Sequence, residues 1–442
     1  MQGALPDSRV MRRAAPKPPH YEARPGSLEA TAQFPTGTSL RVERNRERYY
    51  PGLAGESPPT LSLYDHALGV IGNARRVLDA GCGSGMGTQL LSQRVAEVIG
   101  IDKSQLAVNF ARSMAPDAKL FVADLATPLS LGAVDAAVMI DVLGHVAAPE
   151  KVLVALRGAL PLGRSLYVAE MAAYPAQYLK APARRAFSRT TLQSLLTTCG
   201  YEVTSWECTD GPFLACVATP FSHPAWEALQ RGLEHAASGD LKVAEKDFAQ
   251  ARAAGRHAIA VEGWLAEAAL GLAERNGDRA IHSFFKTREL APEDPRPLAG
   301  LAHIALAMGD LKEASQFASA AERLDATDVD VACTLALVAE RSGGPAVKGL
   351  WLTASNLAPY ALEIALSVAQ AAVKVEDYDL AVWALERVRS YGDDHGTSLH
   401  LALASALLGA GRRADASLEV QLAEKLCPGD PAVADLLVQL KG

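Results

Sequence analysis

The feature that most constrains this chain is a glycine-rich turn after a short apolar run that ends in Asp79. Three glycines follow at alternate positions: Gly81, Gly83 and Gly85. Glycine lacks a Cβ and tolerates positive φ, so a ligand can lie against bare backbone at such a turn. The segment 88–95 is expected to form a helix whose first amides point back at that ligand. The third glycine of the dinucleotide-binding fingerprint would fall at Met86, so the turn does not have that spacing.

Three further apolar runs, each a candidate strand, end in a carboxylate or are followed by one: Asp102, Asp124 and Asp141. A carboxylate at the carboxyl end of a strand can accept hydrogen bonds from both hydroxyls of a ribose. Asp102 stands 17 positions after Gly85, a suitable distance for that role. Four such runs predict a parallel sheet that carries a ligand at one edge.

Residues 76–218 resemble a class I S-adenosylmethionine-dependent methyltransferase. Four pieces carry the resemblance besides the glycine turn: Asp102, Asp124, 141–146 and 160–166. Arg164 stands where the family usually has a second glycine. The resemblance implies an α/β, Rossmann-like methyltransferase domain with seven strands, the last pair antiparallel. It also implies S-adenosylmethionine as the cofactor.

The same resemblance implies which residues bind the cofactor. Asp79 and the glycines would face its methionine moiety, and Asp102 would face its ribose. Asp124 with Leu125 would frame the adenine, and the segment 141–142 would line the methionine side. The full implied set is Asp79, Ala80, Gly81, Gly83, Gly85, Asp102, Lys103, Asp124, Leu125, Asp141 and Val142. The alternative is a doubly wound domain with a decayed or different nucleotide site.

The remaining elements of this domain follow from apolar patterning. The expected helices are 60–71, 148–160 and 190–199, and the expected strands are 165–169, 201–206 and 213–218. Ser188 is a plausible cap for the last of these helices. The helix at 148–160 is expected to turn four apolar residues toward the sheet: Val152, Val154, Leu156 and Leu160. Three tyrosines are candidates for a lid over the cofactor, with simple packing as the alternative: Tyr49, Tyr50 and Tyr64.

Length and charge limit what else the chain can be. At 442 residues it exceeds what one core usually serves, so two or three domains are expected. The net charge of −7 argues against nucleic acid as the main partner, because phosphate binding requires a basic face. No apolar run reaches the ~20 residues of a membrane span, and no secretory signal is recognised. The scattered cysteines fit reduced thiols in a cytoplasm, with no metal site. The proline-rich segment 1–45 is expected to be disordered.

Beyond Pro220 the composition shifts to alanine and leucine, and a repeat appears. Small or apolar residues recur at intervals of 33 to 36 positions: Ala244, Ala280, Ala314, Val347, Ala381 and Ala416. Four positions after each stand Phe248, Phe284, Ala318, Trp351, Leu385 and Val420. This pattern predicts paired helices, in which the small residue allows close approach and the next residue fills the gap. Residues 225–441 therefore resemble about six tetratricopeptide repeats, an all-α helical solenoid whose groove implies a protein or peptide partner.

The expected organisation is a tail at 1–45, a methyltransferase domain at 46–219 and the repeats at 225–441. Methyl transfer requires an aligned nucleophile, and a hydroxyl acceptor also requires a base. His145, directly after the fourth strand, and Glu170, at the end of the fifth, are the candidates. Positioning without any base is the alternative, and His145 would then only stabilise its loop.

We expect an O-directed methyltransferase for a small molecule or glycan. The segment 141–144 lacks the Asn/Asp-Pro-Pro-Tyr motif that amino-directed members of the resembled family often carry. Two alternatives stay open at the level of sequence. In the first alternative, the chain is an adaptor with a cofactor-sensing or inactive domain. In the second, it is a protein methyltransferase whose repeats recruit the substrate.

Overall fold

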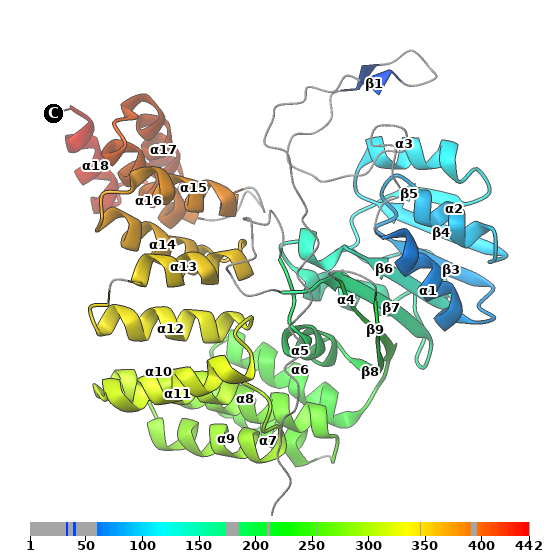
Figure 1. Cartoon of the computed structure of the whole chain (residues 1–442), viewed down its shortest axis with the longest axis horizontal. Helices are drawn as coiled ribbons and strands as arrows, with labels where there is room; N and C mark the ends of the chain where they lie inside the picture. Colours follow the sequence, from blue (N-terminus) through cyan, green and yellow to red (C-terminus); the bar gives the residue numbers. More distant parts are fainter. Residues whose placement is uncertain are drawn as a thin grey trace, which may run out of the picture. The chain divides into compact units, whose positions relative to one another are not determined.

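The computed structural model describes residues 32–33, 39–40, 60–173, 185–209, 213–253, 255–344, 346–389 and 396–441 (Figure 1). The chain divides into two compact units, Met1–Arg46 and Glu47–Gly442. The seven-stranded sheet, the candidate site and the long helical region all belong to the second unit.

In the first unit, strand β1 (Ala32–Gln33) pairs antiparallel with β2 (Ser39–Leu40). The other residues of the segment 1–45 lie outside the described residues, so their expected disorder stays a prediction. The same holds for the lid candidates Tyr49 and Tyr50.

A seven-stranded sheet organises the first part of the second unit. Its strands are β3 (Arg76–Ala80), β4 (Glu97–Asp102), β5 (Lys119–Val122), β6 (Ala136–Ile140), β7 (Ser165–Met171), β8 (Tyr201–Glu207) and β9 (Phe213–Pro220). They lie in the order β5-β4-β3-β6-β7-β9-β8, and β9 pairs antiparallel with both β7 and β8. This confirms the predicted seven strands with an antiparallel last pair. Since the connections change direction between β3 and β6, a ligand crevice is expected at the carboxyl ends of these two strands.

Helices cover both faces of the sheet (Figure 1). They are α1 (Leu61–Ile71), α2 (Met86–Ser92), α3 (Gln105–Met114), α4 (Pro149–Arg157) and α5 (Arg189–Thr198). Successive strand residues point to opposite faces and so join different cores. Leu78 packs in one core with residues of α4 and α5, whereas Val77 packs in the other with residues of α1 and α2.

The helix expected at 148–160 forms α4, but its buried face differs from the prediction at one position. Val152 and Leu156 are buried as predicted, whereas Val154 is 52% exposed. Successive residues of an α-helix are about 100° apart around the axis, so Val154 lies on the side opposite Val152 and Leu156. Leu153 is buried instead. The expectation for Val154 is wrong because its apolar character does not place it on the sheet side.

A helical region follows the sheet. Its helices are α6 (Pro224–Ala237), α7 (Leu241–Ala253), α8 (His257–Ala273), α9 (Gly277–Leu290), α10 (Arg296–Met308), α11 (Leu311–Leu324), α12 (Val329–Arg341), α13 (Val347–Leu357), α14 (Leu362–Val373), α15 (Tyr378–Arg389), α16 (Gly396–Gly409), α17 (Arg413–Leu426) and α18 (Pro431–Lys441). Each recurrent pair of small and larger residues falls on one odd-numbered helix from α7 to α17. These residues are buried, except for the half-buried Val347. Within the described ranges, every helix is too short or too polar to span a bilayer.

Helix α5 packs directly against the helical region. The indole Nε1 of Trp226 donates to the Thr198 carbonyl at 3.1 Å, and the Arg157 guanidinium lies 4.3 Å from the Trp226 ring centroid. Two helix pairs further on, at the start of α10, Arg296 Nη1 donates to Ser194 Oγ at 2.8 Å. The two parts of this unit therefore share a polar and aromatic junction.

Candidate functional site

The glycine turn, residues 81–85, joins β3 to α2 and has no side chain at alternate positions. Gly81 and Gly85 have φ of 81° and 86°, values that residues with a side chain rarely adopt. A Cβ on Gly81 would lie 2.4 Å from Val142 Cγ2, and one on Gly85 would lie 2.6 Å from Ala111 Cβ. Both positions therefore require glycine, for conformation and for space.

Asp79 lies beneath this turn and holds it in place. Its carboxylate is buried and accepts a hydrogen bond from the Tyr64 hydroxyl at 2.9 Å and one from Thr88 Oγ1 at 2.6 Å. Burial raises the pKa of Asp79 to about 6, and the two hydroxyl donors oppose that rise. Tyr64 thus packs within the domain as an anchor, which is the alternative to the lid role. Ala80 is buried in the sheet core, so its side chain faces away from the turn.

Asp102 links the end of β4 to the glycine turn. Its Oδ2 accepts the Gly83 amide at 3.1 Å, and its Oδ1 accepts the Ser104 amide at 2.8 Å. The side chain is 9% exposed, at the carboxyl edge where a ribose would lie. Lys103, the next residue, is exposed.

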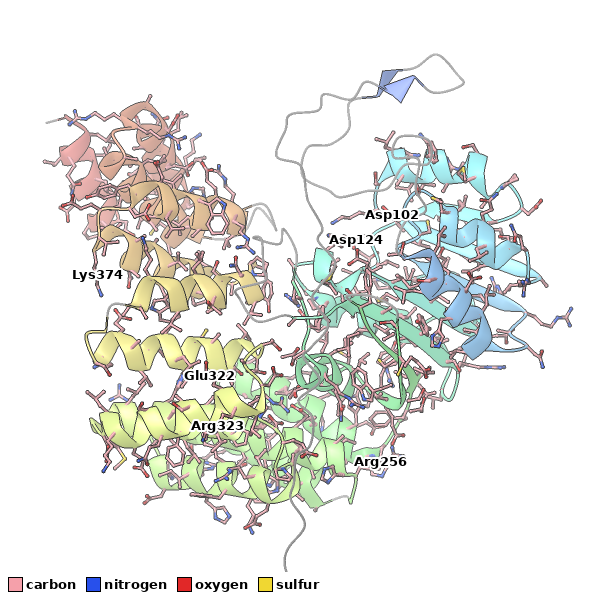
Figure 2. All side chains as sticks on the ribbon, viewed as in Figure 1. Asp102, Asp124, Arg256, Glu322, Arg323 and Lys374 are labelled. Atoms are coloured by element: carbon pink, nitrogen blue, oxygen red, sulfur yellow. The ribbon has the colours of Figure 1, made fainter. Side chains whose placement is uncertain are left out.

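The predicted adenine-framing pair follows β5. Asp102 pairs with Val122 in the sheet, so Asp124 lies just beyond the same edge, as Figure 2 shows. Asp124 is exposed, and its Oδ1 accepts the Ala126 amide at 2.9 Å. Leu125 is buried in the core. The structure thus brings together Asp102, at the end of β4, and Asp124, just after β5, which the sequence placed at one edge of the sheet.

A tight loop after β6 forms the other side of the site. Asp141 has a φ of 58°, the left-handed region that non-glycine residues seldom occupy. Its amide donates to the Ala169 carbonyl at 2.7 Å. Val142 is buried against Gly81. His145 is 36% exposed, and its Nε2 lies 3.6 Å from Asp141 Oδ2. The loop therefore presents a histidine–aspartate pair beside the glycine turn.

Glu170 holds this loop from below. Its Oε1 accepts the amides of Val142 and Leu143 at 2.9 and 2.7 Å, and its Oε2 accepts the Gly144 amide at 3.1 Å. The residue is fully buried. Burial, and then the Asp141 carboxylate, raise the pKa of Glu170 to about 8, while the three amides oppose that rise. With both oxygens engaged by backbone, Glu170 is placed to position the loop, a role that the sequence did not suggest.

Sequence reasoning also missed Arg185. Its backbone amide donates to the Gly144 carbonyl at 2.9 Å, and its Nη2 donates to the Ala147 carbonyl at 3.3 Å. Arg185 stands 41 positions after Gly144, and no local pattern marks a contact across such a distance.

The residues present fit the cofactor that the sequence implied. The glycines at alternate positions of the turn leave room for the methionine moiety, and helix α2 begins directly after the turn. Asp102 supplies a carboxylate for ribose hydroxyls, and the carboxyl edge of β3 and β6 supplies the crevice. Fold and site together agree with the S-adenosylmethionine-dependent methyltransferase domain that the sequence resembles.

Comparison with known proteins agrees with that class. Residues 78–167 match the family described as "Methyltransferase domain". Ubiquinone biosynthesis O-methyltransferase of Pseudomonas aeruginosa is 27% identical over 143 residues, which is 31% of this chain and 61% of that protein. A probable S-adenosylmethionine-dependent methyltransferase of Mycobacterium tuberculosis is 40% identical over 73 residues, 16% of this chain and 27% of that one. The chain thus spans less than two thirds of these relatives. The cofactor of the domain is S-adenosylmethionine.

Two solved structures are each similar to part of this chain. Magnesium protoporphyrin IX methyltransferase from Synechocystis is 18% identical, with 37% of this chain and 84% of that chain covered at a TM-score of 0.32. The Cut9–Hcn1 complex of the APC/C is 17% identical, with 49% and 43% covered at a TM-score of 0.41.

Proposed function

We propose that residues 46–219 form an S-adenosylmethionine-dependent methyltransferase that acts on a hydroxyl group of a small molecule or glycan. The observation that carries the proposal is the Asp102 carboxylate, which accepts the Gly83 amide at 3.1 Å and so stands against the glycine turn. The O-methyltransferase name of the Pseudomonas relative supports oxygen as the acceptor atom.

The chain's own residues would orient the reactants. S-adenosylmethionine supplies a methyl group that its sulfonium sulfur already activates, so alignment and exclusion of water are the main tasks left to the protein. The buried carboxylate of Asp79 holds the glycine turn, and that of Glu170 holds the loop after β6. The turn and the loop meet where Gly81 contacts Val142. Because both loops are fixed by buried carboxylates, the site is organised before any ligand enters.

His145 is the group we assign to the proton of the acceptor hydroxyl. Its imidazole is exposed enough to meet an acceptor, and Asp141 Oδ2 lies 3.6 Å from its Nε2, close enough to orient the ring. Glu170 is the weaker candidate, since the loop amides occupy both of its oxygens.

For the helical region, 225–441, we infer a tetratricopeptide-like solenoid that binds a protein or peptide. The support is the burial of the recurrent residues on alternate helices. A protein bound by the helical region would bring the methyltransferase domain to the place where the methyl acceptor is made.

The first test is cofactor binding, measured by isothermal titration with S-adenosylmethionine and with its demethylated product. Asp102→Ala should weaken binding by about 1.5–3 kcal/mol, the scale for losing hydrogen bonds to a charged group. Asp117→Ala, which removes an exposed carboxylate after α3, is the matched control and should bind as the wild type does. A wild-type protein that binds NAD but neither sulfur compound would sink the proposal.

The second test separates the possible acceptors. Methyl-labelled S-adenosylmethionine is incubated with the protein and a cell extract, and the label is then sought in the small-molecule and protein fractions. The proposal expects label in small molecules or glycans, and lower incorporation with His145→Ala. Label in a protein would favour a protein methyltransferase. Cofactor binding without transfer would favour an adaptor.

A further inference from the structure

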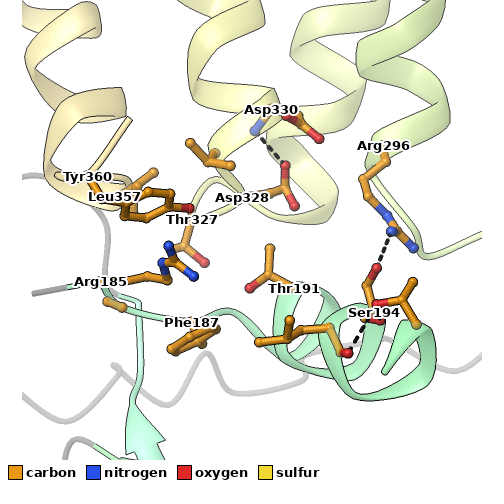
Figure 3. Close-up of a pocket in the computed structure, with 14 residues that line it drawn as sticks. Arg185, Phe187, Thr191, Ser194, Arg296, Thr327, Asp328, Asp330, Leu357 and Tyr360 are labelled. Carbon is orange, nitrogen blue, oxygen red and sulfur yellow. Dashed lines mark hydrogen bonds between the residues drawn. The ribbon is translucent and has the colours of Figure 1, made fainter. Parts of the chain in front are cut away.

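A cavity of about 320 Å³ lies at the junction between α5 and the helical region (Figure 3). We call it the junction cavity. One wall comes from the loop at Arg185 and Phe187 and from α5, and the other comes from the starts of α10 and α12 and the end of α13. Its volume is at the low end of the range for small-molecule pockets. The glycine turn contributes no lining residue.

Asp328 presents an unsatisfied oxygen to this cavity. The residue caps α12, and its Oδ1 accepts the amides of Asp330 and Val331 at 2.9 and 3.2 Å. Figure 3 shows the carboxylate among the lining side chains. Asp328 is only 1% exposed, and its Oδ2 has no hydrogen-bond partner among the described residues. A buried acceptor without a donor is costly, so a ligand that brings a donor is favoured here.

The charges around Asp328 favour a cationic donor. Arg296 Nη2 lies 2.6 Å from Asp294 Oδ2 and 2.9 Å from Glu262 Oε1, so two carboxylates already match its single charge. Asp330 adds a further carboxylate to the lining. On the opposite wall, the Arg185 guanidinium lies 3.4 Å from the centroid of the Tyr360 ring. Four carboxylates therefore stand against two guanidinium groups.

The rest of the lining suits an aliphatic stem. Phe187, Leu195, Val329 and Leu357 contribute apolar surface beside the carboxylate. We propose that the junction cavity binds the primary ammonium group of a small aliphatic amine, which donates to Asp328 Oδ2. The site is distinct from the proposed methyl-transfer site and does not depend on it.

The test uses the full chain and two probes of equal shape, n-butylamine and n-butanol, with binding followed by isothermal titration. Butylamine should bind saturably and butanol should not. In Asp328→Asn the amide oxygen can still cap α12, so the fold is retained. The loss of the negative charge should weaken butylamine binding by at least about tenfold. Asp310→Asn changes the exposed cap of α11 and should leave butylamine binding unchanged.

Three outcomes would overturn the proposal. One is equal binding of butanol and butylamine, and another is undiminished butylamine binding by Asp328→Asn. Absence of butylamine binding by the wild type at millimolar concentration is the third. In the last part of the experiment, the full chain is titrated with a lysine tripeptide whose ends are blocked. If the tripeptide binds and butylamine does not, the ammonium group belongs to a protein partner and the small-molecule assignment falls.

Discussion

Buried carboxylates set the geometry of the site at the scale of single residues. Asp79 takes its donors from the hydroxyls of Tyr64 and Thr88, and Glu170 takes its donors from three backbone amides. None of these donors is charged, so burial outweighs them and raises the pKa of both carboxyls. Each group binds a proton more tightly in the folded chain than in the unfolded one. Stability should therefore fall as the pH rises.

Glu170 allows that expectation to be measured. Its pKa of about 8 lies well above the usual value near 4.5, so stability is fully present below the usual value and is lost as the pH rises through 8. Between pH 6 and 9 the wild type should lose about 2.5 kcal/mol that Glu170→Gln retains, since the amide does not titrate. Urea unfolding of both proteins at the two pH values checks this. Identical pH dependence of the two proteins would refute it.

At the scale of elements, each helix pair of the helical region buries residues against its neighbours. Phe284 of α9 is 6% exposed and packs with Ala268 and Leu301 of the neighbouring helices. The next residue, Phe285, is 44% exposed. Adjacent phenylalanines on one helix thus differ only in the face they occupy, because successive helical residues are about 100° apart.

These two phenylalanines make a matched pair for mutation. Phe284→Ala should cost about 3–5 kcal/mol of the stability of the helical region, because it leaves a cavity between helix pairs. Phe285→Ala should change stability by less than about 0.5 kcal/mol, as exposed substitutions usually do. Urea titration followed by helical circular dichroism measures both. Equal losses in the two variants would show that the assigned buried face is incorrect.

At the scale of the whole second unit, one chain of contacts joins the helical region to the cofactor site. Tyr360 lies after α13, and its ring carries the Arg185 guanidinium at 3.4 Å. Arg185 in turn donates to the carbonyls of Gly144 and Ala147. That loop also carries Val142, which packs on Gly81. The helical region therefore supports the loop beside the glycine turn.

Removing the tyrosine ring should reach the cofactor site through this chain of contacts. Tyr360→Leu abolishes a cation–π contact worth about 1 kcal/mol, so affinity for S-adenosylmethionine should fall by up to about fivefold. Tyr360→Phe keeps the ring face and should bind nearly as the wild type does. Tyr378→Leu removes another tyrosine of the helical region, one that packs on Gly409, and is the control. If Tyr360→Leu and the control bind the cofactor alike, the helical region does not support the loop.

The sequence by itself determined the strands, the glycine turn and the periodic positions of the helices. These features depend on local patterns, such as an apolar run that ends in an acid or a small residue every 33 to 36 positions. The Ser188 cap of α5 belongs with them, since its partner Thr191 is three residues away. The local pattern was insufficient at Val154, where apolar character did not tell the buried face of α4 from the exposed one.

Only the tertiary structure decided what the buried polar groups do. Glu170 looked like a base at the end of a strand, but the amides it accepts lie 26 to 28 positions earlier in the chain. Arg185 had no signal in the sequence, because its partners come from a distant segment. The helix cap that Asp328 forms is local, but distant segments form the cavity beside its second oxygen. A buried polar side chain takes its function from whichever groups the fold brings within hydrogen-bond distance, and that choice is made only when the chain packs.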